Sequence, residues 1–202
     1  MSRYAVLVCG LNIRNHNRIT VEEQRTALDA VADQLTVTWI VGDKGTYLIT
    51  SDHEGAHVVD VVLRALITHR PDLKIPGAAV ASPAAVGIGL AELANVLTSK
   101  YGQDFDPEDH SIRSDGELWR AGLALPLFPG EIPARRSLFE KIKNAIVLGW
   151  TNGCVLVVKR EAKNVHWGNT VTDPASRRLK RLDGLVVQLT SRSGNVLREL
   201  VG

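Results

Sequence analysis

The sequence predicts an α+β protein made of two tandem ferredoxin-like (βαββαβ) subdomains, each followed by an extra helix. Two observations predict this class. The order of predicted elements in residues 1–97 recurs in residues 117–202, and each half contains a hairpin with a tight-turn signal. The stretch 98–116 is polar and rich in Gly, Asp, Pro and His, so we expect it to be a linker between subdomain 1 (1–97) and subdomain 2 (117–202).

The first half opens with an unbroken apolar run at Ala5–Cys9, which is typical of a strand covered on both faces. Thr20 and Glu23 form a capping box, so a helix is predicted from about residue 21 to residue 35. The remaining elements expected in this half are strands at 36–41 and 46–50 around the turn Gly42–Gly45, a helix capped by Ser51 or Asp52 and ended by Pro71, a strand at 76–82, and a helix capped by Ser82 with Pro83 as its first residue.

The second half is expected to repeat this plan. Its hairpin turn is Thr151-Asn152-Gly153, and Asn-Gly is the strongest short turn signal. Asp173 caps a predicted basic helix, and Gly184 is the glycine that follows it. The other expected elements are a strand at 118–127, a helix at 134–144, hairpin strands at 145–150 and 154–160, a strand at 185–190 and a final helix at 196–200.

Composition restricts the class of protein. The apolar fraction of 45% over 202 residues is ample for a core, and no apolar run reaches the roughly 18–20 residues that a membrane helix needs. The N-terminus lacks the pattern of a signal peptide. The only two cysteines, Cys9 and Cys154, each lie in an apolar strand-like run and are expected to be buried thiols. We therefore predict a cytoplasmic protein with no membrane partner and no cofactor.

Charge is distributed unevenly along the chain. Residues 1–132 hold 11 Lys and Arg against 17 Asp and Glu, whereas residues 133–202 hold 13 against 5. Such a split indicates either two halves that attract each other or a basic face meant for an anionic partner.

Three polar segments are candidates for binding an anion: the loop from Asn12 to Arg18, which ends at a helix N-terminus, the basic helix at 177–181, and the loop from Thr190 to Asn195. The alternative is that the loop and the basic face are merely solvated, the commoner case. The candidate ligand-binding residues are Gly10, Asn12, Arg14, Asn17, Arg18, Arg177, Arg178, Arg181, Ser191, Arg192 and Asn195.

The element order and two motifs resemble the bacterial domain of unknown function 1697 family. Gly10-Leu11-Asn12-Ile13 and Asn17-Arg18-Ile19 match the family's opening turn and loop, and Thr190–Leu197 holds the place of its closing loop. The chain departs from the family at Cys9, where the family has arginine, at the hairpin Gly42–Gly45, and at Gly194, where it has tryptophan. The resemblance implies two ferredoxin-like subdomains in tandem and assigns no activity.

His53-Glu54-Gly55-Ala56-His57 matches the H-E-x-x-H pattern of zinc enzymes. The motif falls at a predicted helix start, Gly55 weakens the helix there, and no third ligand is evident at a familiar spacing, although Asp60 and His69 lie downstream. We therefore predict no metal site. Nucleophile-elbow, P-loop and dinucleotide-binding signatures are absent from the sequence, and Gly87-Ile88-Gly89 is interpreted as a packing feature of a helix.

Two functions from different classes remain. The favoured hypothesis is a non-enzymatic module that binds a small anionic ligand or nucleic acid. The alternative is an enzyme with a site in the cleft between the two subdomains, of which a metal-dependent hydrolase using His53, Glu54 and His57 is the least favoured form.

Overall fold

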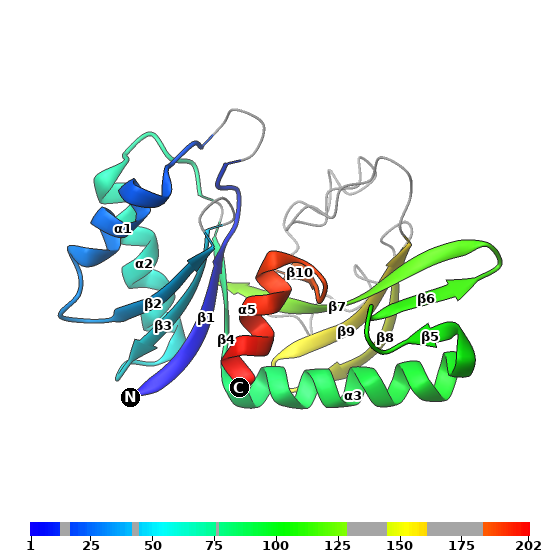
Figure 1. The fold of residues 1–202 in the computed structure, drawn as a ribbon. Helices are drawn as coiled ribbons and strands as arrows, with labels where there is room; N and C mark the ends of the chain where they lie inside the picture. The colour runs from blue at the N-terminus through cyan, green and yellow to red at the C-terminus, as the bar shows by residue number, and fades with distance from the viewer. Residues whose placement is uncertain (13–16, 42–44, 76, 129–144, 161–183) are drawn as a thin grey trace.

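A computed structural model describes residues 1–12, 17–41, 45–75, 77–128, 145–160 and 184–202. The predicted mixed α+β class is confirmed: these residues form antiparallel sheets and helices (Figure 1). The elements are β1 (Ser2–Val8), α1 (Val21–Asp29), β2 (Thr36–Val41), β3 (Thr46–Ser51), α2 (Gly55–His69), β4 (Ala78–Ala81), α3 (Pro83–Tyr101), the 3₁₀ turn η1 (Gly102–Asp104), β5 (Phe105–Asp106), β6 (Ser111–Ser114), β7 (Glu117–Phe128), β8 (Ala145–Thr151), β9 (Cys154–Arg160), β10 (Gly184–Gln188) and α5 (Arg192–Val201).

The first sheet has the strand order β2-β3-β1-β4, and all of its neighbouring strands are antiparallel. The second sheet is organised around the long strand β7. On one side β7 pairs with β9, which pairs with β8. On its other side β7 pairs first with β6 and then with β10. A short pairing of β4 with the end of β7 joins the two sheets.

Two apolar cores hold these layers together. One lies between the first sheet and the helices α1 and α2, and its strand residues include Val6, Tyr47 and Ile49. The other begins on the opposite face of the same sheet, with Ala5 and Leu7, and continues through α5 and α3 to the second sheet. Because successive residues of β1 point to opposite faces and both faces are covered from Ala5 onward, the part of the strand from Ala5 to Val8 is apolar on both faces.

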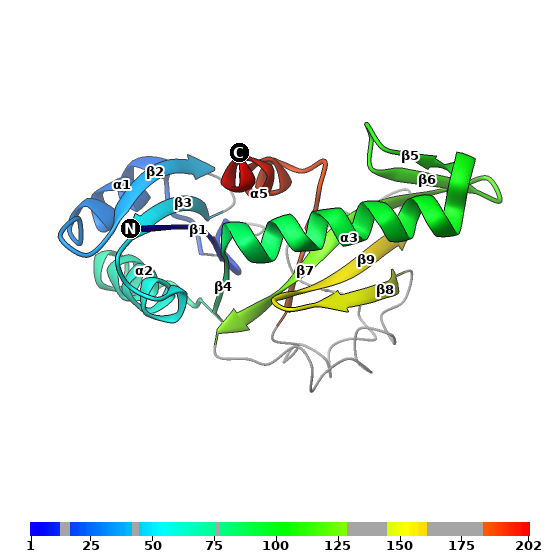
Figure 2. The same ribbon diagram turned by 90° about the horizontal axis from the view of Figure 1, so that it is seen from below.

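Each extra helix packs against the half that did not precede it. Helix α3 follows the first four strands but lies along β8 and β9 of the second sheet (Figure 2). Helix α5 ends the chain but lies against β1 and β3 of the first sheet. No helix in the described ranges is both long and apolar enough to cross a membrane.

Several element boundaries differ from those expected. Helix α1 ends at Asp29, because the chain continues as tight turns in which N–H groups bond to carbonyls three residues back, as at Gln34. Helix α2 begins at Gly55 with Glu54 as its cap, since Ser51 instead completes β3 and its hydroxyl donates to the Gln34 carbonyl.

The expected linker 98–116 contains the last turn of α3, η1, β5 and β6. Its Asp115-Gly116 pair forms a hairpin turn between β6 and β7, with φ values of 52° and 74°. The helices expected at 134–144 and 173–182 lie outside the described residues.

Candidate functional site

The loop after β1 is closed by the side chains of two of its asparagines. The Asn12 amide donates to the Ile19 carbonyl and accepts from the Ile19 N–H, at 3.1 and 2.9 Å. The Asn17 amide donates to the carbonyls of Gly10 and Lys74, and its oxygen accepts from the Lys74 N–H at 2.9 Å. Both residues have positive φ, which asparagine tolerates better than most residues. These amides therefore hold the loop in shape.

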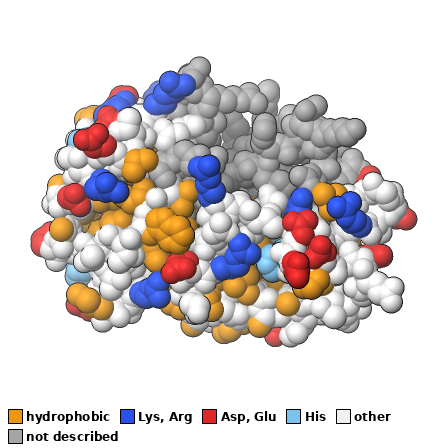
Figure 3. All heavy atoms as spheres, in the orientation of Figure 1, with side chains coloured by type: hydrophobic (Ala, Val, Ile, Leu, Met, Phe, Trp, Pro, Cys, Tyr) orange, Lys and Arg blue, Asp and Glu red, His pale blue; other side chains and the backbone are white. Residues whose placement is uncertain are grey.

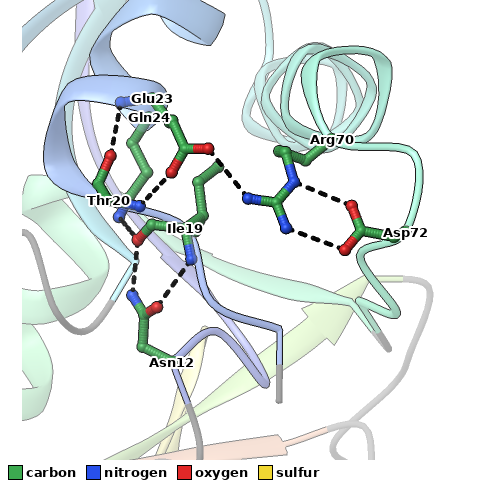
Figure 4. A network of polar contacts seen from close by, with 7 residues as sticks. All are labelled: Asn12, Ile19, Thr20, Glu23, Gln24, Arg70 and Asp72. Carbon is green, nitrogen blue, oxygen red and sulfur yellow. Dashed lines mark hydrogen bonds and ion pairs between the residues drawn. The ribbon is translucent and has the colours of Figure 1, made fainter. Parts of the chain in front are cut away.

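A chain of polar contacts anchors the same loop to the core (Figure 4). Gln24 is fully buried on α1; its amide donates to the Ile19 carbonyl and its oxygen accepts from the Tyr47 hydroxyl at 2.7 Å. The predicted capping box is present, with the Glu23 carboxylate accepting from the Thr20 N–H. The loop end at α1 is thus fixed by bonds made from both the helix and the sheet.

Arg70 bridges this helix start to the end of α2. Its guanidinium donates to the carboxylates of Glu23 and Asp72, each at 2.9 Å (Figure 4). Backbone and side-chain hydrogen bonds at Thr20, together with Arg70, lower the pKa of Glu23, and Arg70 lowers the pKa of Asp72. Arg70 is therefore part of the support of the loop, with its charge directed at two carboxylates of this chain.

The N-terminus of α5 reaches the same end of the first sheet. Ser191 caps the helix: its hydroxyl accepts from the Gly194 N–H at 3.1 Å and donates to the Gln188 carbonyl at 2.6 Å. The predicted final loop therefore ends at Ser191, and Arg192 and Asn195 belong to the first turn of the helix. The hydroxyls of Ser193 and Thr46 are 2.9 Å apart and buried.

Gly194 is required by close packing at this point. A Cβ there would lie 2.3 Å from the Gln188 carbonyl oxygen and 2.4 Å from that of Leu189. The first turn of α5 therefore sits directly on the chain that leaves β10, and a larger residue needs a different backbone path.

Three segments thus meet at one end of the first sheet. Gly45, which immediately precedes β3, lies so close to the β1 loop that a Cβ added there would be 2.7 Å from a methyl group of Leu11. The Gly45 carbonyl accepts from the Val8 N–H. Thr46, the next residue, contacts α5 through Ser193. We call this arrangement the loop junction: residues 10–12 and 17–19, Gly45 with Thr46, and residues 191–195.

The structure places some of the predicted ligand-binding residues at the loop junction. Gly10, with φ of 82°, makes the turn after β1, and the exposed Arg18 and Arg192 extend from the loop and from α5. Asn195 is also exposed, and its side chain accepts a hydrogen bond from Arg198. Outside the described residues lie Arg14, Arg177, Arg178 and Arg181. On the face shown in Figure 3, Lys and Arg side chains are interspersed with Asp and Glu.

Sequence reasoning missed Thr46 and Ser193. Thr46 opens β3 outside any motif, and Ser193, although it lies within the predicted Thr190–Asn195 loop, was not among the candidate residues. Their contact joins residues 147 positions apart in the chain.

The H-E-x-x-H motif straddles the start of α2. His53 precedes the helix, Glu54 is its cap without a side-chain capping bond, and His57 lies in the first turn. The two imidazole rings are 4.4 Å apart between centroids. In the described part of the chain, no group of three or more His, Cys, Asp or Glu residues is arranged to hold a metal ion.

Both cysteines are buried. Burial raises the pKa of the Cys9 thiol to about 12, and it raises the pKa of the Cys154 thiol against an opposing hydrogen bond from Thr151. A thiolate is the nucleophilic form of cysteine, so neither residue is set up as a nucleophile at neutral pH.

No protein-family model matches the chain, and no curated protein matches it. Among solved structures, the chain is similar to the conserved bacterial protein SP0830 from Streptococcus pneumoniae, with a TM-score of 0.62 and 14% sequence identity. The likeness covers 100% of this chain and 99% of that one. At this level of identity, what the two chains share is the fold.

Proposed function

We propose that this protein is a non-enzymatic module that binds a phosphate-bearing ligand at the loop junction, with single-stranded nucleic acid as the first ligand to test. The observation that carries the proposal is the buried contact between Thr46 and Ser193, which fixes the first turn of α5 beside the turn before β3. It supports the proposal because it brings a helix N-terminus to the loop that the sequence marks as an anion site.

The chemistry of the junction suits an anion. A helix N-terminus carries a partial positive charge and N–H groups that the helix itself does not satisfy. Arg18 on the loop and Arg192 on α5 are exposed and add full positive charges. Because Asn12 and Asn17 use their amides to hold the loop, little conformational entropy is lost there on binding. In this proposal the asparagines support the loop, and the arginines contact the phosphate.

A non-enzymatic role fits the packing between the first and second halves of the chain. If the protein were an enzyme of the alternative kind, its site would lie in a cleft between these halves. Among the described residues, that region holds the apolar core formed by β1, α5, α3 and the second sheet. Buried leucine and valine side chains supply neither a nucleophile nor a general base.

We also propose that the architecture is a tandem pair of ferredoxin-like subdomains and that the chain belongs to the domain of unknown function 1697 family. The order β2-β3-β1-β4 is matched in the second half by β8-β9-β7-β10, again with all neighbours antiparallel. The contact at Gly194 accounts for one departure from the family pattern, because this backbone leaves no room for a tryptophan there.

Binding of labelled single-stranded RNA and DNA, measured by fluorescence anisotropy at about 50 mM and about 200 mM salt, tests the proposed function. The variant Arg18→Ala/Arg192→Ala should weaken binding to a similar degree for different sequences, because phosphate contacts carry no sequence information. Each lost contact should reduce the magnitude of the log K versus log salt slope by about 0.7 for single strands.

Arg64→Ala is the matched control, since Arg64 is exposed on α2 and paired with Asp60. It should leave binding unchanged. The variant Arg177→Ala/Arg181→Ala tests whether the basic segment contributes to the same surface. If the wild type binds neither nucleic acid at the lower salt concentration, the nucleic-acid form of the proposal is wrong; if Arg64→Ala weakens binding as much as the double variant, the loop junction is not the site.

A further inference from the structure

A pocket of about 160 Å³ lies at the other end of the molecule, where α3 ends. Ligand sites for drug-sized molecules occupy roughly 300–1,000 Å³, so this pocket suits a single small group. Its lining residues come from the last residue of α3, the end of β6, the turn between β6 and β7, the start of β7, and β8: Tyr101, Ser114, Asp115, Glu117, Trp119 and Ile146.

Sheet register brings four of these residues to one face. Glu117 pairs with Ser114, and Glu117 and Trp119 are two positions apart on β7, so they share a face. Ile146 pairs with Val158, which in turn pairs with Ala121, two positions beyond Trp119. The α3 end closes this face with Tyr101, and the tight turn places Asp115 at the rim.

The lining combines two aromatic rings with two carboxylates. Aromatic faces attract cations through the ring quadrupole, and nearby carboxylates add direct attraction. A cation of this chain already uses one of these rings: the Lys100 ammonium lies 5.4 Å from the centroid of the Tyr101 ring. Arg113, which pairs with Leu118, belongs to the opposite face of the sheet from Glu117 and Trp119, whereas the backbone position of Arg160 pairs with Trp119 itself.

We propose that this pocket binds a small organic cation that carries a methylated ammonium group. The methyl groups fit the aromatic and aliphatic walls of Tyr101, Trp119 and Ile146, while the charge is balanced by Asp115 and Glu117. A bare metal ion would leave the apolar walls without a role, and the described residues contain no cluster of metal ligands. The site is distinct from the loop junction, and its ligand has the opposite charge.

Choline and its uncharged carbon isostere, in which a tert-butyl group replaces the trimethylammonium group, test the proposal. The readout is the indole N–H resonance of Trp119 in a ¹⁵N-labelled protein, assigned with Trp119→Phe. Choline should shift this resonance saturably, and the isostere should shift it at least several-fold less. Asp115→Asn and Glu117→Gln should each weaken choline binding about two- to fivefold, the range expected for partly exposed charge pairs.

Asp29→Asn, which removes an exposed carboxylate at the end of α1, is the control and should leave choline binding unchanged. Equal binding of the isostere would overturn the proposal, since the pocket would then be merely apolar. Absence of choline binding would also overturn it. The backbone position of Arg160 pairs with Trp119, so Arg160→Ala is tested as well. Choline binding that appears only in this variant would overturn the proposal, because the wild-type pocket would then not bind choline. Asparagine tolerates the positive φ of residue 115, so Asp115→Asn should fold normally.

Discussion

Gly89 offers the sharpest test of how α3 packs. It lies inside α3 and faces the second sheet, and a Cβ added there would be 2.4 Å from the Cys154 sulfur. Ordinary contacts of this kind are 3.4–4 Å, so an alanine at this position is about 1 Å too close. The sequence interpretation of the Gly87–Gly89 pair as a packing feature is thus borne out at Gly89.

The expected free energies follow from this geometry. Overpacking a core costs about 1–3 kcal/mol, whereas replacing a helical glycine by alanine gains up to about 1 kcal/mol. Gly89→Ala should therefore lower the free energy of unfolding by about 0–3 kcal/mol. Cys154→Ala should lower it by about 1 kcal/mol through loss of buried volume. In the double variant the new methyl group occupies space left by the sulfur, so the double variant should be more stable than the sum of the single changes predicts, by about 1–3 kcal/mol.

Urea unfolding of the wild type, both single variants and the double variant measures this coupling energy. Gly87→Ala is the matched control: its Cβ would meet Val201 at 3.6 Å, an ordinary contact, so it should stabilise α3 and add to Cys154→Ala without coupling. If Gly89→Ala and Cys154→Ala are additive within about 0.5 kcal/mol, this face of α3 does not rest on β9 and the reasoning is refuted.

Three further predictions concern other parts of the chain. Thr46→Val and Ser193→Ala should each lower the free energy of unfolding by about 1–3 kcal/mol, because each leaves the hydroxyl of the other residue buried without its partner. In a double-mutant cycle measured by denaturant unfolding, the double variant should lose less free energy than the sum of the single variants. Strict additivity would contradict the contact. Arg120 lowers the pKa of Asp109, so this pair stabilises the folded state above the unfolded-state pKa of about 3.9 and loses its effect as pH falls through the lower folded-state value. The difference in unfolding free energy between wild type and Asp109→Asn should be under about 1 kcal/mol at pH 7 and should shrink below about pH 4; a difference that grows with acidity would reverse the assignment. Elemental analysis of the purified protein should find no stoichiometric zinc. A content of about one zinc per chain in the wild type, lost in His57→Ala, would show this prediction to be wrong.

Local signals predicted the described elements well. The capping box of Thr20 and Glu23, the Ser82 cap with Pro83, and the Asn152-Gly153 turn each act within a few residues, so the sequence contains the whole cause. The Asp115-Gly116 turn was equally readable, but the polar composition around it suggested a linker. A short hairpin with one exposed side looks like a loop when only composition is weighed.

The candidate site was predictable only as a set of segments. The asparagine-rich loop was correctly located after β1, yet the roles of its amides depend on Ile19 and Lys74, and Lys74 is distant in the sequence. The pocket at the end of α3 could not be foreseen, because Tyr101, Trp119 and Ile146 come together only through sheet register and helix packing.

The sequence by itself determined where strands, helices and turns form, because periodicity, caps and turn residues act locally. It also determined that β1 is covered on both faces, since Ala5 to Cys9 are all apolar. Only the tertiary structure decided that α3 covers the second sheet and α5 the first. The apolar stripe of a helix indicates that this face must be buried. It does not indicate which element covers the face, because the hydrophobic effect is non-directional. That choice depends on close fits such as Gly89 against Cys154 and Gly194 against the chain after β10, which form between residues far apart in the sequence.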